Sequence, residues 1–135
     1  MYKLEKPLYH GTSAASAIFI IGGYGFNPPL YLTEDKAAAI HYARAATAYL
    51  ERYLEEEAQG NKPIKDGFAL FTFYSVPDKE CLIPDDYNPE AEPNQWKYTK
   101  RLKGLSHFRC EYFPLDVNKD ERIRLQCFAI GMWRR

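Results

Sequence analysis

Cysteine, net charge and long apolar runs are all scarce in this chain. It holds three cysteines, Cys81, Cys110 and Cys127, with neither a CxxC pair nor a metal-ligand spacing. We therefore predict reduced thiols, no metal site and a cytoplasmic protein. No apolar stretch approaches the roughly 20 residues that span a bilayer, and Met1–Pro7 has no apolar signal core. The sequence thus predicts no membrane partner, although delivery into a target cell would leave no trace in these features.

Basic and acidic residues balance at 18 each. The balance argues against a global electrostatic attraction to nucleic acid or to an anionic membrane and leaves only local patches open. A length of 135 residues, 46% of them apolar, fits a single domain over residues 1–135 with a proper core. Aromatic residues make up 16% of the chain, which suits both β-strands and pockets for flat ligands.

The predicted order of strand, helix, strand, long helix and several further strands is typical of an α+β fold. The clearest element is a helix over residues 34–58, where Thr33 is the expected cap and apolar residues recur at intervals of three and four. A shorter helix is predicted over residues 13–21. Strands are predicted over residues 4–10, 30–32, 68–76, 111–115 and 123–130, the last two as a hairpin that turns at residues 117–121.

A histidine-glycine pair closes the first predicted strand. Gly11 would let a flat polar ligand approach the backbone, whose N–H and C=O groups can both bind it, and His10 can hydrogen-bond a hydroxyl group. The alternative is an ordinary strand-to-helix turn in which Thr12 caps the helix.

Two tyrosines follow on the next strand and helix. Tyr31 lies on the short predicted strand, and Tyr42 lies about two turns into the long predicted helix. A strand that leads directly into a helix could place both rings around a planar heterocycle. The alternative is that both rings fill the seam between helix and sheet.

Glu111 interrupts an apolar and aromatic run over residues 108–115. A carboxylate at the start of a central strand is costly unless it is paired or functional. The alternative is a glutamate that faces water at a strand end and pairs with Arg109.

Together these segments resemble the His-Tyr-Glu signature of the ADP-ribosyltransferase family, in its poly(ADP-ribose) polymerase and diphtheria-toxin-like branch. Leu8–Thr12 is similar to the first motif, Leu30–Thr33 with Tyr42 to the second, and Glu111–Asp116 to the third. The resemblance implies a split β-sheet core with flanking helices and NAD+ as co-substrate. It covers most of the chain in order and spacing, but only about fifteen residues in identity.

The resemblance also implies a role for each site residue. His10 would bind the adenosine ribose, Gly11 and Thr12 would hold the nicotinamide carboxamide, and Tyr31 and Tyr42 would stack on the nicotinamide ring. Glu111 would bind the nicotinamide ribose and stabilise the cation that forms as nicotinamide leaves. Removing one such stabilising group typically costs about 10²–10³ in rate.

The expected activity is therefore mono-ADP-ribosyl transfer to a macromolecular acceptor, either protein or nucleic acid. Arg109 stands where arginine-modifying members carry a second acid, so arginine is not the expected acceptor. RNA 2′-phosphotransferases share the first motif but use basic residues where this chain has Tyr31 and Glu111. The short loop over residues 22–29 favours single transfer over chain building. An NAD+ glycohydrolase, a non-catalytic NAD+ or ADP-ribose binder, and a packing domain with accidental motif matches are the alternatives.

A basic and aromatic segment precedes Glu111 and would face the acceptor, according to the resemblance. Its members suit a nucleic acid or an acidic protein surface, and they are Trp96, Lys97, Lys100, Arg101 and Lys103. The alternative is a solvated loop that balances the acidic stretch over residues 84–93. The family setting is compatible with a toxin or effector, a phage or host-defence factor, an antibiotic-modifying enzyme, and a cognate inhibitor, and the sequence does not choose among them.

Overall fold

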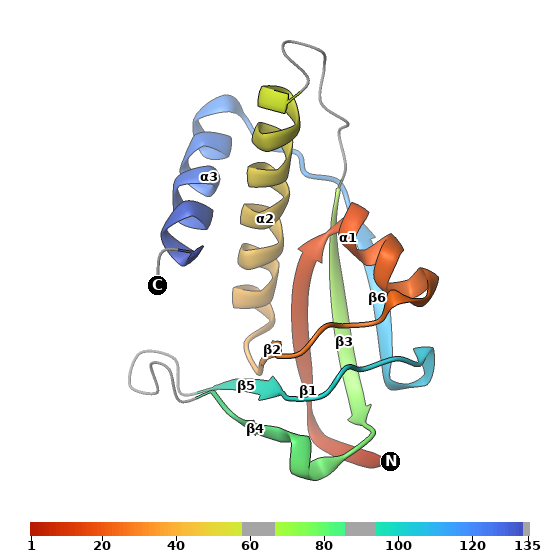
Figure 1. Cartoon of the computed structure of the whole chain (residues 1–135). Coiled ribbons are helices and arrows are strands. Elements are labelled where there is room, and N and C mark those ends of the chain that lie inside the picture. Colours follow the sequence, from red (N-terminus) through yellow and green to blue (C-terminus); the bar gives the residue numbers. More distant parts are fainter. Residues whose placement is uncertain (58–66, 86–93, 134–135) are drawn as a thin grey trace.

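The centre of the molecule is a six-stranded antiparallel sheet in the order β4-β5-β2-β1-β3-β6. It is seen in a computed structural model that describes residues 1–57, 67–85 and 94–133 (Figure 1). The strands are β1 (Tyr2–Ser13), β2 (Leu30–Thr33), β3 (Phe68–Val76), β4 (Leu82–Pro84), β5 (Gln95–Tyr98) and β6 (Phe108–Phe113). The helices are α1 (Ala14–Phe19), α2 (Lys36–Glu57) and α3 (Lys119–Trp133), with a π-helical turn η1 (Ile20–Tyr24) and two 3₁₀ turns, η2 (Lys79–Cys81) and η3 (Leu105–His107). The α+β class predicted from the sequence is confirmed.

The sheet consists of two groups of three strands that are joined through β1 and β2. In one half, β3 pairs with β1 and with β6, and in the other, β5 pairs with β2 and with β4. Between the halves, the described residues of β1 and β2 pair at a single position, Tyr9 opposite Thr33. Beyond Tyr9 the two strands part, although β1 continues its pairing with β3 as far as Ser13.

The two faces of the sheet are covered differently. Gly11 faces α2, because a β-carbon at Gly11 would overlap the carbonyl oxygen of Ala39 and come within 2.7 Å of the β-carbon of Ala43. The opposite face carries an aromatic core in which Phe26 contacts Phe71 with ring centroids 4.9 Å apart. Directly opposed residues on paired strands project from the same face, so the register assigns every strand residue to one of these two sides.

The long helix α2 begins slightly later than the sequence predicts. Asp35, rather than Thr33, caps it: the Asp35 carboxylate accepts the N–H groups of Ala37 and Ala38 at 3.0 and 3.3 Å. Thr33 instead accepts the N–H of Asp35 through its hydroxyl group, which tightens the turn between β2 and the helix. The predicted end of this helix, at residue 58, lies outside the described residues, as do residues 86–93 of the predicted acidic loop.

The predicted strand over residues 123–130 is wrong, because residues 119–133 form α3. The Asn118 side chain accepts the N–H of Glu121 at 2.8 Å and caps the helix. Leu125 and Ala129, four residues apart, are buried together against α2. Figure 1 shows α3 stacked on α2, on the side away from the sheet. The helical spacing of these two residues therefore outweighs the apolar run that indicated a strand.

Two further strands, β4 and β5, were not predicted. They pair with each other between Leu82 and Tyr98 and extend the sheet beyond β2. None of the helices in the described part of the chain is long and apolar enough to cross a membrane. The same residues contain no cluster of three potential metal ligands, and the three cysteines are free thiols.

Candidate functional site

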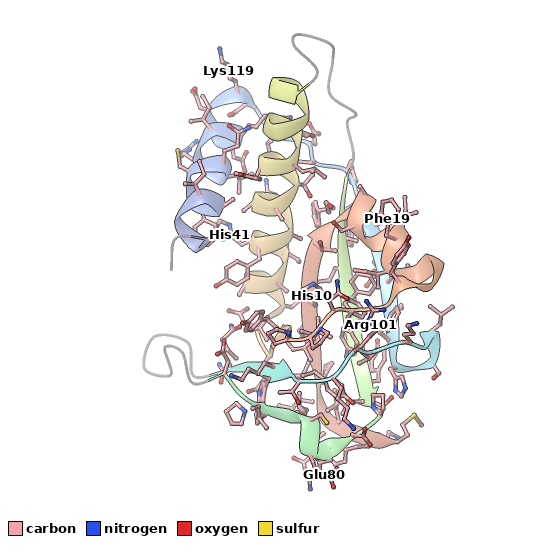
Figure 2. The ribbon with its side chains drawn as sticks, viewed as in Figure 1. His10, Phe19, His41, Glu80, Arg101 and Lys119 are labelled. Atoms are coloured by element: carbon pink, nitrogen blue, oxygen red, sulfur yellow. The ribbon has the colours of Figure 1, made fainter. Side chains whose placement is uncertain are left out.

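His10 lies where the two halves of the sheet part. Its imidazole Nδ1 is 2.9 Å from the main-chain oxygen of Tyr31, so the side chain spans the gap that backbone pairing leaves open. The ring also packs edge-on against Phe26, with centroids 5.6 Å apart. Figure 2 shows His10 near the middle of the molecule rather than at an end of the sheet. The first two sequence motifs therefore meet at a specific hydrogen bond.

The protonation state of His10 follows from this bond and from its surroundings. Burial lowers the pKa of His10 below its ordinary value, and the bond to the Tyr31 oxygen offsets part of the shift. The ring is therefore neutral near pH 7. Because a carbonyl oxygen can only accept, Nδ1 carries the proton and Nε2 keeps its lone pair. Among the described residues, every fully buried side-chain nitrogen has a hydrogen-bond partner. Nε2 of His10 has no partner, so it is not fully buried and a ligand can reach it.

Gly11 and Thr12 continue β1 after His10. Gly11 is required by packing, since α2 lies directly over its α-carbon. A ligand at Gly11 would therefore have to use its main-chain groups at the strand edge, not the space above it. Thr12 pairs with Ala69 of β3, and Ser13 rather than Thr12 caps α1 by accepting the N–H of Ser16 at 3.1 Å.

The ring of Tyr31 is 52% exposed and projects from the face of the sheet that carries α2. On this face the register aligns Tyr31 with Lys97 of β5, and the neighbouring Thr33 with Gln95. The Gln95 amide donates to the Thr33 hydroxyl at 2.9 Å, which fixes the side chain beside β2. An exposed ring, a cation and an amide thus share one face of the smaller half-sheet.

Tyr42 lies on α2 but its ring packs against α3. The Tyr42 and Phe128 ring centroids are 5.7 Å apart, with the rings tilted at 33°. The contact agrees with the alternative that the Tyr42 ring serves packing. The ring lies between α2 and α3, however, and not between helix and sheet. A pair of tyrosines around one heterocycle remains a prediction.

Glu111 shares a face of the sheet with Gly11 and Tyr31 but lies on another strand, so the convergence of all three motifs remains a prediction. It sits on edge strand β6, opposite Leu70, which in turn is opposite Gly11. Two strand spacings, about 10 Å, separate it from Gly11, and it projects from the face opposite to His10. The carboxylate is 36% exposed and pairs with Arg109 at 3.0 Å. Glu111 interrupts an apolar run, but the run belongs to an edge strand. A charged side chain on an edge strand is readily solvated.

The basic segment predicted to face an acceptor is distributed over both faces. Trp96 packs against the aromatic core and donates from its indole nitrogen to Glu34 at 3.3 Å, whereas its neighbour Lys97 projects from the face of Tyr31. Lys100 pairs with Asp78 at 3.3 Å. Arg101 donates to the Asn27 side chain at 2.5 Å.

Gln95 is a candidate site residue that the sequence did not reveal. Its strand is four residues long, follows a proline-bearing acidic segment and has no strong alternation, so β5 gave no clear signal. The one feature of the sequence that could have indicated Gln95 is its position as a polar residue directly before the aromatic residues Trp96 and Tyr98. Comparison of the chain with protein-family models, with curated proteins and with solved structures gives no match.

Proposed function

We propose that this chain is an NAD+-binding domain of the ADP-ribosyltransferase type, which holds the dinucleotide where β1 and β2 part. The observation that carries the proposal is the His10–Tyr31 hydrogen bond across the single bridge between the half-sheets. This arrangement supports the split-sheet core that the sequence resemblance implies.

In this proposal the neutral His10 ring accepts a ribose hydroxyl at Nε2, because Nδ1 is already engaged with Tyr31. The exposed Tyr31 ring offers a flat apolar surface for the nicotinamide ring. Gln95 shares that face, and its amide can both donate and accept, as a ribose hydroxyl or a carboxamide requires.

Transfer of ADP-ribose needs one group more than binding does. Cleavage of the glycosidic bond develops positive charge on the ribose, which a fixed carboxylate stabilises. Among the described acids, Glu111 projects from β6 and pairs with Arg109. Glu34 accepts from the Trp96 indole and lies 3.8 Å from the Lys6 ammonium group. We therefore propose NAD+ binding as the primary function, and transfer to a protein or nucleic-acid acceptor is the second candidate, which the sequence resemblance favours.

The decisive measurement is isothermal titration calorimetry of NAD+ against the purified chain and its variants. His10→Ala and Tyr31→Ala should each weaken binding about tenfold or more, since loss of one stacking ring alone costs about 1–3 kcal/mol. Tyr74→Ala is the matched control, because Tyr74 is also an exposed strand tyrosine, on β3. Absence of NAD+ binding by the parent chain, or equal losses for Tyr31→Ala and Tyr74→Ala, would exclude the proposal.

A parallel assay of nicotinamide release separates binding from transfer and hydrolysis. We expect the parent chain to bind NAD+ and release nicotinamide no faster than the uncatalysed reaction. Release that Glu111→Gln abolishes would instead establish Glu111 as catalytic and the chain as an enzyme. Release only with an acceptor present would identify a transferase, and release without one a glycohydrolase.

A further inference from the structure

An exposed apolar tip stands at the end of α1 and η1. Ala17 is fully buried, and Ile20 and Ile21 pack against the core, so these residues anchor the segment. The intervening and following side chains project outward: Ile18, Phe19 and Tyr24 are 62%, 64% and 65% exposed. The Phe19 and Tyr24 rings meet edge-on with centroids 5.9 Å apart, so they form one surface feature. Large side chains exposed together in this way indicate an interaction site.

Two cations that pair with no acid among residues 1–57, 67–85 and 94–133 lie next to the tip. The Lys103 side chain passes over Gly25, where a β-carbon would lie 2.8 Å from its Cγ, and therefore adjoins Tyr24. Arg101 is held by Asn27 of the same loop, and the backbones of Phe26 and Leu102 are joined by two hydrogen bonds. Neither Arg101 nor Lys103 forms an ion pair with any described residue.

Acidic side chains are absent from both segments that build this region. No aspartate or glutamate occurs over residues 11–33 or 99–110. The whole chain is neutral, so the positive character is local. An occupant of the tip should therefore present an apolar layer next to negative charge.

We propose that the α1–η1 tip, together with Arg101 and Lys103, docks on an anionic lipid surface. An aliphatic side chain, two aromatic rings and adjacent cations form the combination that inserts at a membrane interface. The tip is convex: Figure 1 shows α1 and η1 at the rim of the molecule, and Figure 2 shows Phe19 on that rim. A β-carbon at Gly22 or Gly23 would meet nothing within 4 Å, so the end of the tip is open.

The same features fit a single-stranded nucleic acid less well. Ile18 offers no ring for stacking, and Phe19 and Tyr24 already contact each other edge-on. The proposal is independent of NAD+ binding, because the tip uses neither His10 nor Tyr31.

Co-sedimentation with lipid vesicles tests the proposal. The full chain should sediment with vesicles that contain phosphatidylserine and remain in solution with phosphatidylcholine vesicles, and added salt should release it. Phe19→Ser combined with Tyr24→Ser should weaken sedimentation about tenfold or more. Arg101→Gln combined with Lys103→Gln should weaken it about twenty-fivefold, since each cation near such a surface contributes roughly fivefold.

Matched controls lie on β3 and α3, outside the tip. Tyr74→Ser with Ile123→Ser removes two apolar side chains that are each 47% exposed, and Lys119→Gln with Arg124→Gln removes two exposed cations from α3. Both controls should sediment like the parent chain. The proposal is overturned if the parent chain does not sediment with anionic vesicles, if tip and control variants behave alike, or if the tip variants lose only binding to a single-stranded oligonucleotide.

Discussion

The imidazole of His10 donates to the main-chain oxygen of Tyr31 at 2.9 Å, across the line where the two half-sheets separate. Backbone pairing cannot continue there, and a side chain takes its place. The bond fixes the tautomer of the ring and leaves Nε2 as an acceptor. A structural constraint and a candidate binding group are thus combined in one residue.

Acid should destabilise the fold through two histidines. Burial lowers the pKa of His10, and burial together with the N-terminal charge lowers the pKa of His107, whose Nδ1 lies 2.9 Å from the Ser75 hydroxyl oxygen. As the pH falls below the ordinary value of 6.5, the unfolded chain binds protons that the folded chain does not. The free energy of unfolding should therefore be highest above this value and fall toward acid.

Urea denaturation at a series of pH values measures this dependence. His10→Gln and His107→Gln should each flatten the decline between pH 6.5 and the acid limit, because each removes one differential proton. His41→Gln is the control, since His41 is exposed on α2. A decline that is as steep in the two buried-site variants as in the parent chain would show that other groups cause it.

Gly11→Ala should disrupt the contact between α2 and β1. The added methyl group would overlap the Ala39 carbonyl oxygen, which belongs to helix backbone and cannot swing aside. Overpacking of this kind costs about 1–3 kcal/mol or more in unfolding free energy. Gly22→Ala adds the same group in open space and should change stability by less than about 0.5 kcal/mol. Equal midpoints of urea denaturation for the two variants would contradict the packing described here.

The sequence was a good guide where one physical signal dominated. The apolar run of β3 and the alanine-rich stripe of α2 were predicted because their burial follows their periodicity. The sequence was a poor guide where packing against another element determines the secondary structure. Residues 123–130 are helical because Leu125 and Ala129 pack on α2. The local sequence does not indicate that α2 is their packing partner.

The candidate site divides in the same way. His10 and Tyr31 were predicted to belong together, and a hydrogen bond joins them. Glu111 was selected because an acid in an apolar run is costly in a central strand. Its strand is at the edge of the sheet, which only the pairing order reveals, and the Arg109 pairing left open as an alternative is present. Gln95 could not be found without the register between β2 and β5.

Two ion pairs between α2 and α3 should differ in importance. Glu51 is 7% exposed and pairs with Arg122, whereas Arg44 and Glu121, 2.7 Å apart, are 30% and 40% exposed. Arg122→Ala would leave the Glu51 carboxylate buried without its partner, which typically costs about 3–5 kcal/mol. Arg44→Ala breaks a solvated pair and should cost about 1 kcal/mol or less. Urea denaturation should therefore give a much lower unfolding free energy for Arg122→Ala than for Arg44→Ala. Similar losses of unfolding free energy would mean that the Glu51 carboxylate is solvated in the folded chain.

Gln95→Glu should convert an NAD+ binder into an enzyme. Gln95 shares a face with Tyr31, and its amide is fixed by the Thr33 hydroxyl at 2.9 Å. A glutamate has nearly the same shape, and the Thr33 hydroxyl can donate to its carboxylate instead of accepting from the amide. Nicotinamide release should rise about 10²–10³-fold if that carboxylate stands beside the cation formed on the ribose. Glu111→Gln in the same background should leave the gain intact, because β6, which carries Glu111, is separated from β5, which carries Gln95, by β2, β1 and β3. If Gln95→Glu binds NAD+ as the parent does and releases no more nicotinamide, the dinucleotide is held elsewhere on the Tyr31 face and Gln95 takes no part in binding its ribose.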